Sequence, residues 1–244
     1  MIGRKLRVAL AAFSLAALVA AGVAGQFYLR SMRPASAPVL TEGPLAALGA
    51  LRSLAAEVVW FRMDRLQDEG RYVELAQLAS TLTLMEPHTP EVWSHAAWNL
   101  AYNVSVMMNT PEERWHWVDA AIRLLRDEGI ALNPREPELY RELAWLFEIK
   151  LGTNIDSAAA VYREKWKAIV SDVQARGAWQ EELRMDPKRM LMTEQMSGMD
   201  DWTDPLLSAI YWALLGGEFA EGREQRLLHE IARQSKLIHE RNIK

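Results

Sequence analysis

The chain has 244 residues, of which half are apolar and a quarter are charged, a composition typical of a globular protein. It contains no cysteine, which excludes disulfide bonds, thiolate zinc sites, iron–sulfur clusters and a cysteine nucleophile. The net charge of −4 is unevenly distributed, since residues 1–33 carry five basic and no acidic residues, which leaves −9 on the remainder. An acidic body argues against nucleic acid as the main partner.

The first predicted element is a membrane-spanning helix. Basic residues at positions 4, 5 and 7 precede an uncharged run over residues 8–29, and Arg30 and Arg33 follow it. At 1.5 Å per residue the run would span about 33 Å, enough to cross the apolar core of a bilayer. The side chains that would anchor it in lipid are Val8, Leu10, Phe13, Leu15, Leu18, Val19, Val23, Phe27 and Tyr28.

A cleaved secretory signal is the alternative for residues 1–33, because the small residues Ala20, Gly22 and Ala24 fit a cleavage site. We prefer an uncleaved anchor, since the apolar run exceeds the usual signal core of about 7–15 residues. Under either interpretation the first basic residues stay in the cytoplasm, and the rest of the chain is exported.

Residues 34–44 form a Pro/Ala spacer, which three prolines keep extended. Helical periodicity dominates after it, and no stretch shows the sustained alternation of a strand. We predict an all-α fold, with hairpins of helices over residues 45–176 and further helices over 177–244 that pack on them and cap them. The helices are expected over 45–68, 71–86, 90–108, 111–132, 137–151, 156–176, 187–197, 205–215 and 218–241.

Capping residues support these boundaries. Four helices are expected to begin with an oxygen-bearing cap directly before a proline, whose missing N–H costs nothing at that position. A capping box is expected between Thr110 and Glu113. Helix ends are expected at Gly70, Gly129 and Gly152. The four caps are Thr89, Thr110, Asp186 and Asp204.

An internal repeat predicts a solenoid. The segment from Pro87 to Trp93 recurs 47 residues later, from Pro134 to Tyr140. Each copy ends one helix, turns and opens another helix with an aromatic residue in its first turn, as stacked helix pairs require.

These turns, together with residues 69–87, resemble tetratricopeptide (TPR) repeats over roughly residues 45–176. The resemblance implies a right-handed α-solenoid of antiparallel helix hairpins behind the transmembrane helix. The 47-residue spacing departs from the period of about 34 expected of that family, which indicates lengthened helices.

More narrowly, residues 91–106, 113–117 and 137–152 resemble a group of bacterial membrane-anchored, TPR-like envelope proteins. This group has no assigned activity, so the resemblance bears on architecture. It implies a single-pass protein of the bacterial inner membrane with its body in the periplasm, or a protein secreted to the periplasm if the signal is cleaved.

The ten tryptophans are the most prominent candidates for recognition. Tryptophan and tyrosine supply large contact areas in binding grooves, although each tryptophan can equally be part of the core. Asn99 and Asn103 lie one helical turn apart, and two amides beside aromatic rings could hold a peptide backbone or instead fix neighbouring helices. The candidate partner-binding residues are Trp98, Asn99, Tyr102, Asn103, Trp115 and Trp145.

We expect no enzyme, no metal site and no cofactor. The sequence has no GxSxG, no glycine-rich phosphate loop, no HExxH and no histidine pair with i, i+4 spacing. The methionines over residues 185–199 can form an adaptable surface, although filling gaps in the core is the simpler interpretation.

The sequence therefore predicts a non-catalytic protein–protein interaction or scaffold module, tethered to the membrane and serving an envelope assembly, secretion or polymer-export complex. The first alternative is a glycan- or cell-wall-binding protein with an aromatic groove. The second is a structural subunit of a membrane complex, with the anchor and the last helix buried in interfaces.

Overall fold

The computed structural model describes residues 44–242, with side chains from residue 55 onward. In this part of the chain every regular element is helical and there is no strand, which confirms the all-α prediction. The chain divides into two compact units, residues 1–50 and 51–244. The predicted anchor, from Val8 to Tyr28, lies outside the described residues. None of the described helices is both long and apolar enough to cross a membrane.

Most helices match the predicted ranges. A short helix over Trp179–Leu183 was not predicted, and the last helix begins at Gly222 rather than at residue 218. The α-helices are α2 (Pro44–Asp68), α3 (Tyr72–Met85), α4 (Pro90–Trp98), α5 (Pro111–Arg123), α6 (Ile130–Leu132), α7 (Pro137–Trp145), α8 (Ala159–Arg176), α9 (Trp179–Leu183), α10 (Pro187–Ser197), α11 (Pro205–Gly217) and α12 (Gly222–Asn242).

Three long helices change winding along their length. A π-helix of six residues follows α4, α5 and α7, as η1 (Asn99–Val104), η3 (Leu124–Gly129) and η4 (Leu146–Leu151), and a 3-10 turn, η2 (Ser105–Met107), follows η1. The backbone N–H groups of Ser105, Ile130 and Gly152 each donate to the carbonyl five residues earlier, which is the π pattern. The helices predicted over 90–108, 111–132 and 137–151 are therefore continuous but wider in their second halves.

The predicted caps are confirmed at three of four positions. Thr110 and Glu113 form the capping box, and the carboxylates of Asp186 and Asp204 accept N–H groups in the first turns of α10 and α11. Thr89 was predicted to cap α4, but its hydroxyl donates to the carboxylate of Glu86 instead, at 3.2 Å. The Thr89 hydroxyl is thus directed toward Glu86, and it accepts no N–H from the first turn of α4.

The two copies of the repeat have the same local structure. The indole Nε1 of Trp93 donates to the carbonyl of Pro87 at 3.0 Å, and the hydroxyl of Tyr140 donates to the carbonyl of Pro134 at 2.9 Å. Each aromatic side chain also lies against a glycine of a later helix. Gly129, predicted to end a helix, is inside a continuous one, and a Cβ there would lie 3.3 Å from the Trp93 side chain. Its small size permits the close approach.

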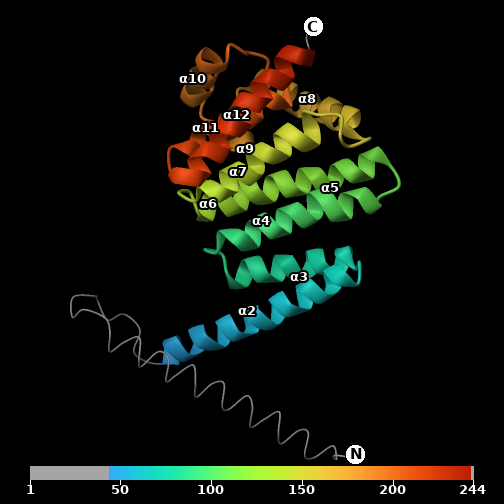
Figure 1. Ribbon diagram of the computed structural model, residues 1–244, viewed down its shortest axis with the longest axis vertical. Coiled ribbons are helices and arrows are strands. Elements are labelled where there is room, and N and C mark those ends of the chain that lie inside the picture. The colour runs from blue at the N-terminus through green and yellow to red at the C-terminus, as the bar shows by residue number, and fades with distance from the viewer. Residues whose placement is uncertain (1–43, 243–244) are drawn as a thin grey trace, which may run out of the picture. The chain divides into compact units, whose positions relative to one another are not determined.

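Successive helices lie in layers through the unit of residues 51–244, from α2 and α3 at one end to α10 and α12 at the other (Figure 1). A smaller core lies among α2, α3 and α4, and a larger one continues from α4 to α12. The centre of the larger core is α11, whose residues 205–213 are all buried as it packs against α7, η4, α10 and α12. An apolar surface all round is what a buried helix requires.

Candidate functional site

Three of the six predicted partner-binding residues form one aromatic stack. Trp98 ends α4, Tyr102 lies in η1 and Trp145 ends α7. The ring of Tyr102 lies between the two tryptophans, with centroids 5.8 Å from that of Trp98 and 5.6 Å from that of Trp145. We call these three residues the aromatic stack.

The repeat explains how the aromatic stack forms. Trp98 and Trp145 occupy equivalent positions, 47 residues apart, and each is the last residue before a π-helix. Tyr102 follows Trp98 by four residues, on the same side of the helix. Consecutive helix pairs therefore bring equivalent tryptophans to either side of one tyrosine, a correspondence that the sequence analysis missed.

The two predicted asparagines face the interior of the helix pair instead. Asn99 is fully buried, and its Nδ2 donates to the carbonyl of Tyr72 at 3.3 Å. Asn103 donates through Nδ2 to the Oδ1 of Asn99 at 3.0 Å. These bonds join η1 to the first turn of α3, so Asn99 acts on the packing of the helices.

A buried ion pair lies beside the aromatic stack, and sequence reasoning did not identify it. The Nζ of Lys150 lies 2.6 Å from the Oδ2 of Asp156, with side chains only 4% and 7% exposed. The same ammonium lies 4.9 Å from the centroid of the Tyr102 ring, within the range of a cation–π contact. A lysine between the apolar residues Ile149 and Leu151 was the available signal, and the repeat makes it equivalent to Asn103.

Burial and hydrogen bonding set the electrostatics of this pair. Burial raises the pKa of Asp156, but the hydrogen bonds and charge of Lys150 and the N–H of Ala158 outweigh it, so the pKa is lowered overall. Tyr162 also donates to Asp156, at 3.3 Å. Burial raises the pKa of Tyr102, whose hydroxyl has no hydrogen-bond partner among the described residues. The site is therefore an ionised Asp156 carboxylate beside a neutral phenol.

Trp115, the sixth predicted residue, reaches this cluster indirectly. It lies on α5, and its ring centroid is 6.0 Å from that of Tyr162, which contacts Asp156. Arg114, the preceding residue, places its Nη1 3.8 Å from the other oxygen of Asp156. The loop that carries Asp156 is thus held from both α5 and η4.

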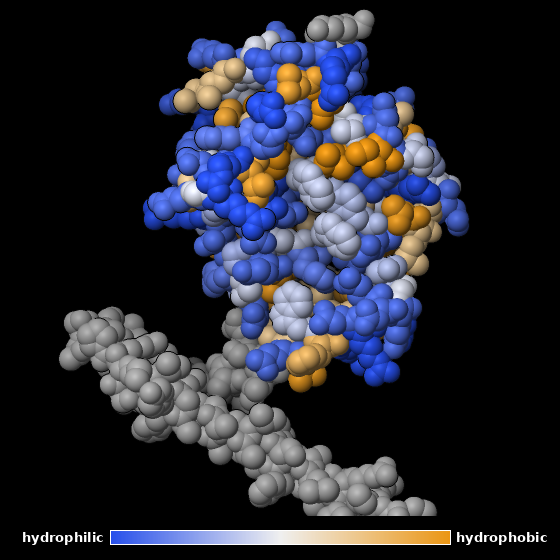
Figure 2. All heavy atoms as spheres, viewed as in Figure 1, coloured by the Kyte–Doolittle hydropathy of each residue, from blue (hydrophilic) through white to orange (hydrophobic). Residues whose placement is uncertain are grey.

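The aromatic stack reaches the surface through one of its three rings. Trp98 is 38% exposed, whereas the other two rings are half-buried and already contact their neighbours. Figure 2 shows pale residues of intermediate hydropathy gathered at the centre of one face, among charged residues. Among the side chains that the structure describes, no three of His, Asp or Glu come together as a metal site.

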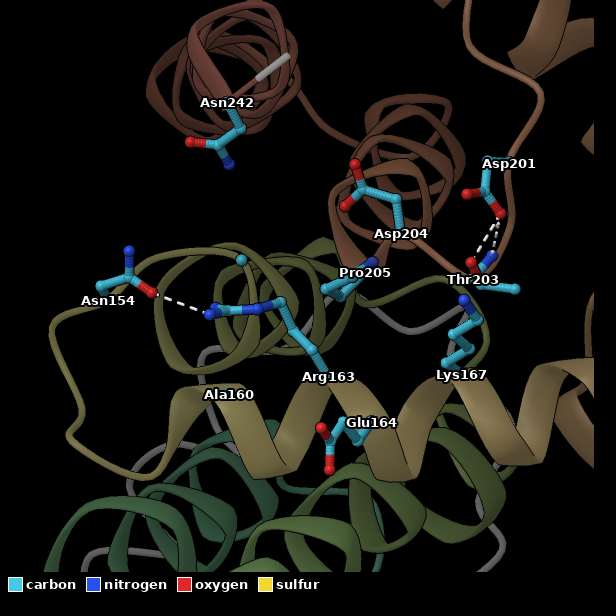
Figure 3. Close-up of a pocket in the computed structure, with 11 residues that line it drawn as sticks. Asn154, Ala160, Arg163, Glu164, Lys167, Asp201, Thr203, Asp204, Pro205 and Asn242 are labelled. Carbon is cyan, nitrogen blue, oxygen red and sulfur yellow. Dashed lines mark hydrogen bonds between the residues drawn. The ribbon is translucent and has the colours of Figure 1, made fainter.

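A cleft of about 540 Å³ lies elsewhere, between α8, the start of α11 and the end of α12. Its charged groups are mostly held by the protein (Figure 3). Arg163 donates to the carbonyls of Leu151 and Thr153 and to Asn154. Asp204 caps α11 and lies 2.7 Å from the Nδ1 of His239. This cleft is polar and charged, unlike the aromatic stack.

The methionines of residues 185–199 divide into two groups. Met185, Met190 and Met199 are buried and fill the core. Met192 and Met196 lie one turn apart on α10, are more than half exposed, and line a cavity of about 210 Å³ against α11. Filling of the core is therefore confirmed for three of these methionines, and an adaptable surface stays a prediction for the two exposed ones.

Comparison of the chain with protein-family models, with curated proteins and with solved structures finds no match.

Proposed function

We propose that this protein is a non-catalytic interaction module. In this proposal, residues 8–29 tether a right-handed, TPR-like α-solenoid to a bacterial inner membrane. The body extends into the periplasm and binds a protein partner of an envelope assembly, secretion or polymer-export complex. The membrane and export parts of the proposal rest on the sequence pattern of residues 1–44.

The observation that carries the proposal is the aromatic stack. It is built from equivalent positions of two consecutive repeats, which is how a solenoid presents a continuous binding surface. Trp98 is partly exposed while the rings beneath it are packed, so the surface is rigid before any partner binds. A rigid aromatic side chain loses little conformational entropy on binding.

The arrangement of Tyr102 favours a protein partner over a glycan. A sugar ring stacks on a free aromatic face, but the Tyr102 ring already contacts Trp98, Trp145 and the ammonium of Lys150. Trp98 then supplies an exposed edge next to a closed cluster, which is typical of an anchor residue at a protein interface.

Site-specific photocrosslinking in intact cells tests this proposal. A photoreactive phenylalanine analogue replaces Trp98 in the full-length chain, and the control replaces Leu132, which is comparably exposed on α6. We expect a discrete protein adduct from position 98 and none from position 132. Equal adducts from both positions would contradict the proposal, as would retention of the purified chain by glycan strands with no protein adduct.

A matched pair of substitutions separates binding from folding. Trp98→Ala should abolish co-purification of the partner identified by the adduct from position 98 and leave the far-ultraviolet circular dichroism unchanged, because Trp98 is partly exposed. Trp93→Ala removes a buried ring and should instead destabilise the fold by about 3–5 kcal/mol. Undiminished co-purification of the partner with Trp98→Ala would contradict the assignment of Trp98.

A further inference from the structure

Helix α2 carries two apolar stripes, on opposite sides. Ala56, Met63 and Leu66 are buried in the small core that α2 shares with α3 and α4. Val58 and Phe61 lie on the other side and are 68% and 75% exposed. Figure 2 shows apolar side chains at the lower end of the body, where α2 lies in Figure 1. The second stripe has no partner within the described part of the chain.

The spacing of the second stripe is that of a coiled coil. Leu51, Leu54, Val58 and Phe61 follow one another at intervals of three, four and three residues on the continuous helix α2. In heptad terms Leu51 and Val58 are a positions, and Leu54 and Phe61 are d positions. Val58 at an a position and Leu54 at a d position fit the pattern that, among parallel coiled coils, favours two strands.

The charges beside the stripe complement a parallel second copy. Glu57 is at a g position and Arg62 is at an e position, and in a parallel pair g of one helix faces e five residues later in the other. Both side chains are exposed, and neither has an ion-pair partner among the side chains that the structure describes. An antiparallel pair would instead place like charges together.

We infer that the chain forms a parallel homodimer through this stripe, which we call the α2 seam. The opposite side of α2 remains packed on α3, so dimerisation requires no change in the fold. The apolar positions end where Arg65 and Asp68 take the next a and d positions. The α2 seam is independent of what the aromatic stack binds.

Disulfide trapping tests the α2 seam in the full-length chain, purified in detergent micelles. The protein has no native cysteine, so one can be introduced at each chosen position. Phe61→Cys at a d position should form a covalent dimer on mild oxidation. Gln67→Cys, exposed on α2 but away from the seam, should remain a monomer. No dimer at position 61, or equal amounts at both positions, would overturn the inference.

Charge exchange tests the parallel orientation by sedimentation. Glu57→Lys places two cations across the seam and should weaken dimerisation on the order of tenfold. Adding Arg62→Glu restores opposite charges and should recover the dimer. Since both residues are exposed, circular dichroism should stay unchanged. A parent chain that sediments as a monomer, or a double variant no stronger than Glu57→Lys, would overturn the inference.

Discussion

At the residue scale, two charged groups in η4 show how burial is tolerated. Lys150 is neutralised by Asp156 at 2.6 Å. Glu148, two residues earlier, is equally buried, but it has no cation partner among the described residues and only accepts a hydrogen bond from Ser235 at 2.7 Å. Burial raises the pKa of Glu148, the hydrogen bond from Ser235 opposes this and the charge of Glu230 adds to it, so the pKa is raised overall.

The raised pKa predicts a pH-dependent effect of Glu148→Gln. The folded state binds this proton more tightly than the unfolded state, so the contribution of Glu148 to stability is complete below its unfolded pKa and is lost as pH rises through the folded pKa. Glutamine stays neutral at every pH. Urea unfolding of Glu148→Gln should therefore show a gain of about 1 kcal/mol at pH 7 and little change at pH 4.

Glu164→Gln, on an exposed position of α8, is the control for this measurement. Its free energy of unfolding should stay within about 0.5 kcal/mol of the parent value at both pH values. A gain from Glu148→Gln that is larger at pH 4 than at pH 7 would contradict the raised pKa.

At the element scale, glycines set how closely the helix pairs approach. Gly216 on α11 lies against the Cβ of Tyr140 on α7, where an added Cβ would be only 2.5 Å away. The hydroxyl of Tyr140 is bonded to the carbonyl of Pro134, so the ring cannot easily move aside. Gly129 lies against Trp93, one repeat earlier, with more room, since an added Cβ would be 3.3 Å from the Trp93 side chain. In both repeats the first-turn aromatic residue meets a glycine of a later helix, and the contact at Gly216 is the one that leaves no space for a methyl group.

Adjacent glycines in α11 offer a matched test of this packing. Gly216→Ala should lower the free energy of unfolding by about 1–3 kcal/mol, because the methyl group overlaps Tyr140. At Gly217 an added Cβ would meet nothing within 4 Å, so Gly217→Ala should be neutral or stabilise α11 by up to about 1 kcal/mol. Chemical denaturation measures the free energy of unfolding of both variants. Equal changes in the two variants would contradict the steric argument.

At the scale of the whole molecule, charge separates the two ends of the chain. Residues 1–33 carry +5, and the remainder carries −9. The proposed tether places the basic residues on the cytoplasmic side and the acidic body beyond the membrane. The α2 seam begins soon after the Pro/Ala spacer, so in this arrangement dimerisation would occur close to the membrane surface.

The proposed topology predicts the outcome of protease treatment. Protease added to spheroplasts should digest the body of the protein. The same protease should leave the body intact in whole cells, and it should leave the proteins of the cytoplasm intact in spheroplasts. The undigested full-length chain should remain with the membranes after alkaline carbonate extraction, since an apolar helix of about 22 residues resists extraction. A body protected in spheroplasts would contradict export, and release by carbonate would instead favour the cleaved signal.

Local signals in the sequence were enough to predict the all-α class and most of the helix boundaries. Helix starts at Thr110, Asp186 and Asp204 depend on bonds within one turn, and the repeated Pro87 and Pro134 segments each form their own turn. These interactions join residues close in the chain, so a pattern of residue types suffices to find them. The all-helical class could likewise be predicted, because helical periodicity is a pattern of residues close in the chain.

Only the tertiary structure decided which of the predicted site residues meet. Tyr102 lies 48 residues from Lys150, and Asn99 lies 27 residues from the carbonyl that it bonds. Whether an asparagine faces a groove or another helix depends on how the helices pack, and the π-helices of η1 and η4 shift that packing by widening the turns. The positions of most helices could be predicted from the sequence alone. Which aromatic and polar side chains contact each other follows only from the packing of the helices, because those contacts join distant segments that no local pattern specifies.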